Sequence, residues 1–225
     1  MKISVIVPVL DEEKQLATTL EALLALAPHE IVVVDGGSSD GSREIAGRLG
    51  VNVISAEHGR ARQMNRGAAR ATGDVLLFLH ADTRLPPSAL YDIGSALADR
   101  RYVGGRFDVE LEGKHWMLPV VARMISQRSR LTKVGTGDQA LFVRRGVFEQ
   151  MGGFPEIPLM EDIAFCRRLK LMGRVACLRS RVVTSGRRWE IDGVWRTILR
   201  MWTLKLLYLG GVSPARLKQF YGDTR

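Results

Sequence analysis

The chain has 225 residues, of which 46% are hydrophobic and 25% are charged, the proportions of a globular protein with a sizeable core. Its 33 Lys and Arg against 24 Asp and Glu give a net charge of +9, which favours anionic partners such as nucleotides, nucleic acids or an acidic membrane face. Two cysteines exclude a disulfide scaffold and a cysteine-only zinc site. The sequence shows neither a signal-peptide pattern nor a membrane-spanning apolar run, so we expect a reducing, cytoplasmic setting.

The first hundred residues alternate strand and helix patterns. Strands are predicted at Ile3–Val9, Ile31–Val34, Val51–Ile54 and Val75–Leu79, which are short apolar runs rich in β-branched residues. Asp11 is placed to cap the first helix. This alternation predicts an α/β fold with a mostly parallel sheet and helices on both faces.

The second half of the chain is less regular. In an open α/β sheet, ligands bind beyond the carboxyl ends of the strands, so residues that directly follow strands are the candidates for function. The predicted strands are Gly105–Leu111, Ala140–Val143, Val175–Leu178 and Val182–Thr184, and the predicted helices lie around Trp116–Ser126, Asp162–Met172 and Val194–Leu209.

Asp35 directly follows the second predicted strand. A carboxylate at that place can accept hydrogen bonds from a ribose or from a base N–H, and the glycine-rich loop after it lets the backbone approach a ligand. An ordinary turn between a strand and a helix is the alternative explanation. The loop lacks the GxGxxG and GxxxxGK[ST] patterns, which disfavours a dinucleotide site and a P-loop.

His80 and Asp82 end the fourth predicted strand, with Ala81 as a spacer between them. The alternation of side chains along a strand predicts that His80 and Asp82 point the same way. Such a pair can hold a divalent cation that neutralises a diphosphate. An aspartate that caps the next helix is the alternative, but that helix is expected only several residues later, at Pro86-Pro87.

Glu161 and Asp162 begin an amphipathic helix pattern. Paired carboxylates at a helix start are explained equally well by the helix dipole and by a general base whose pKa its neighbour raises. Two further sets of polar residues are candidates. Arg62, Arg66 and Arg70 form a basic stripe on the third predicted helix, which a solvated face explains, whereas Arg60 and Asn65 near the start of that helix are placed to reach a sugar or phosphate. Arg187-Arg188 follows the last predicted strand and suits a diphosphate or an ordinary surface.

Four segments in this order resemble the family-two glycosyltransferases: Val5–Glu12, Val33–Ser42, Gly73–Asp82 and the stretch from Arg144 to Asp162. The resemblance covers about residues 2–175. It implies a GT-A fold with a Rossmann-like nucleotide-binding half, a nucleotide-diphosphate-sugar donor, most often a uridine nucleotide, and a divalent cation, Mn²⁺ or Mg²⁺. It also implies inversion at the anomeric carbon of a transferred hexose.

The resemblance also implies roles for individual residues. Asp35 would bind the base or ribose, with Pro8 and Glu12 lining the same pocket. Asp82 matches the last aspartate of the family's Asp-x-Asp motif and would hold the metal and diphosphate, while His80 replaces the first aspartate. Asp162 would be the general base, with Glu161 beside it. The remaining donor-binding candidates are Arg60, Asn65, Ala81, Arg187 and Arg188.

The implied organisation is one GT-A domain over residues 1–192, with a nucleotide-binding half over about 1–100 and an acceptor half over about 101–192, and a helical tail over 193–225. Positions 181–225 hold nine Lys and Arg against three Asp and Glu. The tail's Trp, Leu and Arg residues predict contact with an anionic membrane at its inner face, where a lipid-linked acceptor would lie. A helix that packs on the sheet or on a second copy of the chain is the alternative.

Two other function classes compete with an inverting glycosyltransferase. A sugar-phosphate nucleotidyltransferase would share the strand-end aspartates, but it usually carries a Gly-rich loop with Lys or Arg where this chain has the acidic Asp11-Glu12. A nucleic-acid-binding module is indicated only by the charge. With 7% aromatic residues and no recognition motif, we expect no nucleic-acid partner.

Overall fold

One mixed sheet organises the computed structural model, which describes residues 1–220 and holds eight strands within them. The strands are β1 (Ile3–Val9), β2 (Glu30–Asp35), β3 (Asn52–Ser55), β4 (Val75–Phe78), β5 (Thr83–Arg84), β6 (Tyr102–Glu112), β7 (Leu141–Arg144) and β8 (Arg174–Ser185). The helices are α1 (Glu13–Ala25), α2 (Ser42–Arg48), α3 (Arg60–Arg70), α4 (Ala89–Ala98), α5 (Leu118–Thr132), η1 (Gly137–Gln139), α6 (Arg145–Gln150), α7 (Glu161–Met172), α8 (Arg187–Asp192), α9 (Val194–Leu209) and α10 (Pro214–Phe220).

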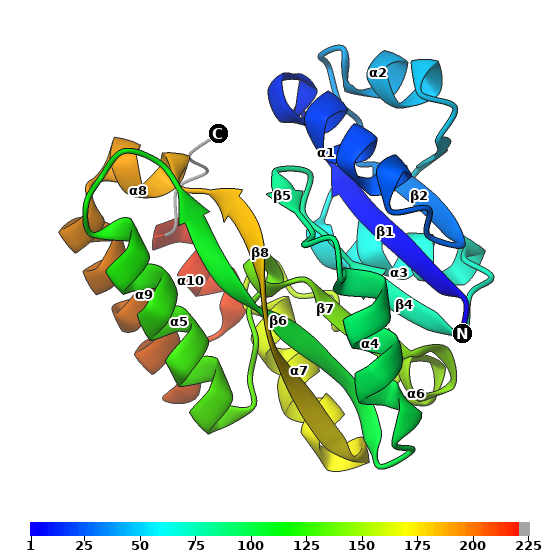
Figure 1. Ribbon diagram of the computed structural model, residues 1–225. Helices are drawn as coiled ribbons and strands as arrows, with labels where there is room; N and C mark the ends of the chain where they lie inside the picture. The colour runs from blue at the N-terminus through cyan, green and yellow to red at the C-terminus, as the bar shows by residue number, and fades with distance from the viewer. Residues whose placement is uncertain (221–225) are drawn as a thin grey trace.

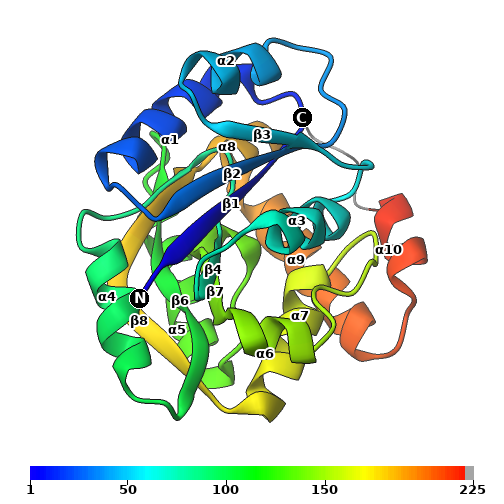
Figure 2. The same ribbon diagram turned by 90° about the vertical axis from the view of Figure 1, so that its right-hand side faces the viewer.

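The strand order is β3-β2-β1-β4-β7-β6-β8-β5 (Figures 1 and 2). The first four strands in this order pair in parallel, whereas β7 runs antiparallel to both of its neighbours, β4 and β6. The amino end of β7 therefore lies at the same edge of the sheet as the carboxyl ends of β1 and β4. The predicted α/β class with a mostly parallel, mixed sheet is confirmed.

Helices cover both faces of the sheet (Figures 1 and 2). The side chains of the strands alternate between two hydrophobic layers, one on each face. Val5 and Val7 of β1 pack with α1, α2, α4 and α5 on the first face, and Ile6 packs with α3, α6 and α7 on the second. Because both faces are covered, these strands are apolar throughout, as in other buried parallel sheets.

Helix α3 lies unusually close to the sheet. A Cβ atom on Gly67 would come within 2.5 Å of Ile6 Cγ2, so only glycine permits this approach. The buried Gln63 Nε2 donates hydrogen bonds to the carbonyl oxygens of Val9 and Val34, at 2.8 and 2.9 Å. Helix α3 is thereby fixed over the carboxyl ends of β1 and β2.

Two local predictions are wrong, and one predicted helix has different bounds. The two strands predicted at Val175–Leu178 and Val182–Thr184 are one strand, β8, because register shifts in its pairing with β6 let it continue. The helix predicted from Trp116 begins at Leu118, with a proline in its first turn, and runs to Thr132. Asp11 does not cap α1: its φ is 53°, and its carboxylate accepts the N–H of Ser39 instead.

The C-terminal helices pack against the rest of the chain (Figure 2). Val194 of α9 belongs to the first-face core, while Leu204 of α9 and Leu217 of α10 form a cluster with Met160 and Ile163 at the start of α7. The predicted boundary at residue 192 falls between α8 and α9, and residues 221–225 of the predicted tail lie outside the described residues. None of the described helices is long and apolar enough to cross a bilayer.

Candidate active site

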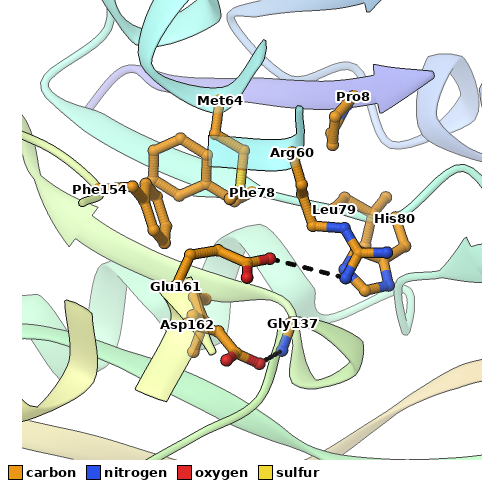
Figure 3. A pocket seen from close by; sticks show the side chains of 11 residues that line it. Pro8, Arg60, Met64, Phe78, Leu79, His80, Gly137, Phe154, Glu161 and Asp162 are labelled. Atoms are coloured by element: carbon orange, nitrogen blue, oxygen red, sulfur yellow. Dashed lines mark hydrogen bonds and ion pairs between the residues drawn. The ribbon is translucent and has the colours of Figure 1, made fainter. Parts of the chain in front are cut away.

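A narrow pocket lies on the second face of the sheet, between the carboxyl ends of β1 and β4 and the starts of α3 and α7 (Figure 3). It brings together five of the sequence-predicted residues: Pro8, Arg60, His80, Glu161 and Asp162. Apolar side chains and one glycine complete its lining: Met64, Phe78, Leu79, Gly137, Leu141 and Phe154. We call this the carboxylate pocket.

Glu161 and Asp162 occupy the first turn of α7, which begins after Met160 in a left-handed conformation with φ 68°. Glu161 is 6% exposed, and its Oε1 lies 3.7 Å from Arg60 Nη1. Asp162 Oδ2 accepts a hydrogen bond of 2.9 Å from the N–H of Gly137. The two neighbouring carboxylates are therefore fixed by different partners, from α3 and from the loop before β7.

Burial raises the pKa of Asp162 from 3.8 to about 6, and the negative charge of Glu161 contributes to the rise. The hydrogen bond from Gly137 and the charge of Arg60 act in the opposite direction. A carboxylate with this pKa is suited to take up a proton near neutral pH.

His80 reaches the carboxylate pocket from the end of β4. Burial, and then the positive charges of Arg60 and Arg188, hold the pKa of His80 well below 6.5, so the imidazole is neutral. Its Nε2 is buried without a hydrogen-bond partner among residues 1–220. A Cβ atom on Gly137 would lie 2.5 Å from that nitrogen, so the loop reaches His80 only because residue 137 is glycine.

Asp82 does not lie beside His80 in this pocket, and the prediction that the two side chains point the same way is wrong. Strand β4 ends at Phe78, and a turn closed by the Thr83 N–H on the His80 carbonyl redirects the chain. Asp82 lines a second cavity of about 290 Å³ on the side of α1. Its other lining residues are Lys14, Gln15, Thr18, Thr19, Arg84, Glu112, Ser185, Arg187 and Glu190.

Asp82 offers one carboxylate to a metal ion. Its Oδ1 accepts weak hydrogen bonds from the hydroxyls of Thr83 and Thr184, at 3.3 and 3.4 Å. Within the described part of the chain, no three His, Cys, Asp or Glu side chains converge on one point. Mg²⁺-type ions are commonly held by one or two carboxylates, with substrate phosphates completing the shell. The single carboxylate of Asp82 therefore fits a metal ion whose remaining ligands come from a diphosphate.

Asp35 is 1% exposed and organises the loop that follows β2. Its carboxylate accepts the N–H groups of Gly37 and Ser38, at 3.2 and 3.1 Å, and forms an ion pair of 3.2 Å with Arg43. Glu12, the half-buried residue that directly precedes α1, donates its N–H to Ser42 Oγ at 2.9 Å. The geometry of Asp35 accounts for a well-ordered loop whether or not a nucleotide also binds there.

Two of the residues predicted to bind the donor, Asn65 and Ala81, contact other parts of the protein instead. Asn65 Nδ2 donates to the Phe154 carbonyl, and its Oδ1 accepts the Phe154 N–H, at 2.9 and 2.8 Å. Asn65 thus anchors the loop that carries a wall of the carboxylate pocket. Ala81 is buried in the hydrophobic cluster of the first face.

The two predicted arginines occupy different places. Arg187 is exposed and lines the second cavity. Arg188 is half-buried, and burial and the charge of Arg60 lower its pKa, while the charges of Asp192 and Asp82 oppose that shift. Because its charge acts on both His80 and Asp82, Arg188 links the two cavities electrostatically.

The loop before β7 contains site residues that the sequence reasoning missed. Besides Gly137, it holds Asp138, whose buried Oδ1 has no hydrogen-bond partner among the described residues and whose pKa burial raises. Arg128 of α5 acts electrostatically on both Asp138 and Asp162. This loop precedes a strand instead of following one, and it reaches the same edge of the sheet because β7 runs antiparallel to β4. Two glycines around Thr136, just before a predicted strand, were the available signal.

The mixed sheet, with helices on both faces and a pocket at its strand ends, is an α/β fold of the GT-A type. The family model described as glycosyl transferase family 2 matches residues 4–152. The chain belongs to that family, and the resemblance inferred from its motifs is confirmed.

Curated relatives include an undecaprenyl-phosphate 4-deoxy-4-formamido-L-arabinose transferase from Serratia proteamaculans, 28% identical over 74% of this chain and 57% of the relative. A dolichol-phosphate mannosyltransferase from Pyrococcus furiosus is 28% identical over 68% of this chain and 45% of the relative. The chain thus spans about half the length of these two proteins.

Solved structures confirm the GT-A fold. A fragment of S. aureus TarS in complex with UDP-GlcNAc matches with a TM-score of 0.64 and 21% identity, over 82% of this chain and 58% of that one. Glucosyl-3-phosphoglycerate synthase from Mycobacterium tuberculosis, in complex with Mn²⁺, UDP and glucosyl-3-phosphoglycerate, matches with a TM-score of 0.57 and 20% identity, over 80% and 70% of the two chains.

Proposed function

We propose that this glycosyltransferase transfers a hexose, with inversion, from a uridine-diphosphate sugar to an acceptor hydroxyl, with Asp162 as the general base. The observation that carries the proposal is the Asp162 carboxylate itself. It is held by Gly137, has a pKa raised to about 6, and faces the same pocket as Arg60 and His80. Family membership favours this activity over a nucleotidyltransferase or a nucleic-acid-binding module.

The proposed reaction is a single in-line displacement. The acceptor oxygen attacks C1 of the sugar from the face opposite the nucleotide, and the Asp162 carboxylate takes the hydroxyl proton. The bond between C1 and the phosphate oxygen breaks, and its electron pair leaves with the nucleoside diphosphate. General-base assistance of this kind typically contributes about 10²–10⁴-fold to the rate.

Cationic side chains would stabilise the departing diphosphate. Arg60 and Arg188 act on the carboxylate pocket, and Arg187 lines the cavity of Asp82. Arginine suits this role because its guanidinium binds phosphate oxygens through two hydrogen bonds. A divalent cation held by Asp82, Mn²⁺ or Mg²⁺, would supply further charge neutralisation when bound. In the neutral state, His80 Nε2 is available to one polar group of the donor.

The nucleotide would lie along the carboxyl ends of β1 and β2. Pro8 lines the carboxylate pocket, and Glu12, four residues further along the chain, directly precedes α1. Asp35, whose carboxylate already accepts N–H groups from the loop after β2, would also contact the base or ribose. Asn65 acts here as a positioning residue, since its amide holds Phe154.

A lipid-linked acceptor is supported by the names of the curated relatives, which are undecaprenyl-phosphate and dolichol-phosphate transferases. We place the protein in the cytoplasm, at the inner face of the membrane. Assembly into a homodimer is the competing explanation for the exposed apolar residues of α9.

A donor screen tests the proposed function. Nucleotide sugars are added with Mn²⁺, and the melting temperature and the release of nucleoside diphosphate are measured, followed by mass spectrometry of products formed with cell lipids. We expect one uridine-diphosphate sugar to raise the melting temperature and to be consumed only with the metal. If no nucleotide sugar binds at any metal concentration, the proposal is wrong.

A further inference from the structure

Helix α9 carries an exposed apolar stripe. Its members are all at least half exposed and recur every three or four residues, so they share one face of the helix. They are Trp195, Leu199, Trp202, Leu206 and Leu209. We call this face the α9 stripe. Large exposed apolar patches on a folded protein mark surfaces that meet a partner or a membrane.

The opposite face of α9 already has its partners. Val194, Thr197 and Leu204 are buried, and Leu204 packs with Met160 and Ile163 on either side of the Glu161-Asp162 pair. The helix is therefore fixed in place while its stripe faces outward. The free face is not required for the fold that residues 1–220 show.

The charges around the stripe have one sign. Arg196 and Lys205 flank it on its two sides, and residues 193–220 contain five Lys and Arg and no Asp or Glu. Such a surface is complementary to anionic lipid headgroups, with basic side chains reaching phosphates while apolar ones enter the acyl boundary. Two tryptophans on the stripe suit the same boundary, because the indole ring is apolar with one polar N–H.

A second copy of the chain fits this surface poorly. Two paired α9 helices would bring Arg196 and Lys205 of one copy against the same basic residues of the other, whereas helix pairs usually place opposite charges at such flanking positions. The helix has 16 residues, about two heptads, and stable coiled coils usually sustain three or four. Charge and length both favour the membrane.

We infer that the α9 stripe docks the protein on an anionic bilayer, with the helix lying in the plane of the surface. At about 1.5 Å per residue, α9 would lie along about 24 Å of membrane. Leu204 of α9 and Leu217 of α10 pack with Met160 and Ile163, the residues on either side of Glu161 and Asp162 in the chain. The docked helix is therefore in direct contact with the segment that carries the two carboxylates of the pocket. The inference deepens the proposed function, since a lipid-linked acceptor would be met at that surface.

Vesicle flotation of the full chain tests this inference without any donor or acceptor. Vesicles of phosphatidylglycerol and phosphatidylcholine are compared with phosphatidylcholine alone, at low and high salt. We expect binding to the anionic vesicles only, weakened by salt. Trp202→Ser should lower the affinity about tenfold, as expected for losing one partly inserted side chain, and Lys205→Gln should lower it about fivefold.

Matched controls separate docking from general effects of exposed apolar residues. Leu171 on α7 and Leu131 on α5 are both more exposed than any residue of the stripe, so Leu171→Ser and Leu131→Ser should bind vesicles like the wild type. Trp202→Phe keeps an aromatic ring and should retain most of the binding. Circular dichroism and melting temperature check that each variant folds.

The inference is overturned by either of two flotation results or by one light-scattering result. The flotation results are that the wild type fails to float with anionic vesicles at low salt, or that Trp202→Ser floats equally well. The light-scattering result is a dimer that Trp202→Ser converts to a monomer, which would make the stripe a subunit interface. Donor-induced shifts in melting temperature, measured without vesicles, report separately on the proposed function.

Discussion

The N–H of Gly137 donates a hydrogen bond of 2.9 Å to Oδ2 of Asp162, and this contact joins the loop before β7 to the first turn of α7. It favours the ionised carboxylate, whereas burial and the nearby Glu161 favour the protonated one. The balance sets the pKa of Asp162 at about 6. The protonation state of the proposed base therefore changes within the range in which enzyme activity is usually measured.

The rate of transfer should rise with pH through about 6, because only ionised Asp162 accepts a proton. Arg60 lowers the pKa of Asp162, so Arg60→Met should move the rising limb to higher pH. Arg62→Met is the control, since Arg62 is paired with Glu57 and Glu156 instead. Profiles of kcat/KM against pH for the three proteins measure the effect. If kcat/KM rises over the same pH range in Arg60→Met as in the wild type, Arg60 does not influence the pKa of Asp162.

Asp162→Asn should stabilise the fold at neutral pH. A carboxyl whose folded pKa is raised from 3.8 to about 6 favours folding while protonated and loses that advantage as pH rises through about 6. The free energy of unfolding of the variant should exceed that of the wild type by about 2–3 kcal/mol at pH 8. Near pH 4 the difference should nearly vanish. Urea unfolding at both pH values decides this, and a difference independent of pH would contradict it.

Gly137→Ala should destabilise the protein through a steric clash with His80. The added Cβ would lie 2.5 Å from His80 Nε2, and overpacking of this kind costs about 1–3 kcal/mol of stability. Gly146→Ala is a matched control, because a Cβ atom there would meet nothing within 4 Å. Unfolding free energies of both variants test the prediction. Equal stabilities would show that His80 moves freely away from the loop.

Asp82→Asn should abolish Mn²⁺-dependent binding of the donor while the melting temperature of the free protein stays close to that of the wild type. The reason is that Asp82 is half-buried in the second cavity and makes only weak hydrogen bonds of 3.3 and 3.4 Å. Calorimetric titration of the donor with and without Mn²⁺ measures this. Metal dependence that persists in the variant would place the ion elsewhere.

The sequence predicted the sheet and much of the carboxylate pocket because both follow from simple periodicities. Apolar runs located the strands of the first half, and the rule that ligands lie beyond strand ends found His80, while helix amphipathicity found Glu161 and Asp162. Asp82 was misplaced because side-chain alternation holds only within a strand, and the chain turns after His80.

Gly137 and Asp138 were missed because their position depends on the direction of β7, which pairs antiparallel with β4. Strand direction is decided by tertiary pairing, and nothing in the local pattern around Gly137 reports it. The α9 stripe was only partly visible for a similar reason. The sequence of α9 is apolar around most of the helix, and its packing on α7 determines which side is left exposed.

The most direct measurement of the central claim is a comparison of wild type and Asp162→Asn with one donor, in which donor binding and product formation are followed together. The account predicts that the donor raises both melting temperatures equally, while product formation falls about 10²–10⁴-fold in the variant. Glu149→Gln, an exposed carboxylate on α6, should keep full turnover. Near-normal turnover in Asp162→Asn, with donor binding intact, would contradict the assignment of Asp162 as the base.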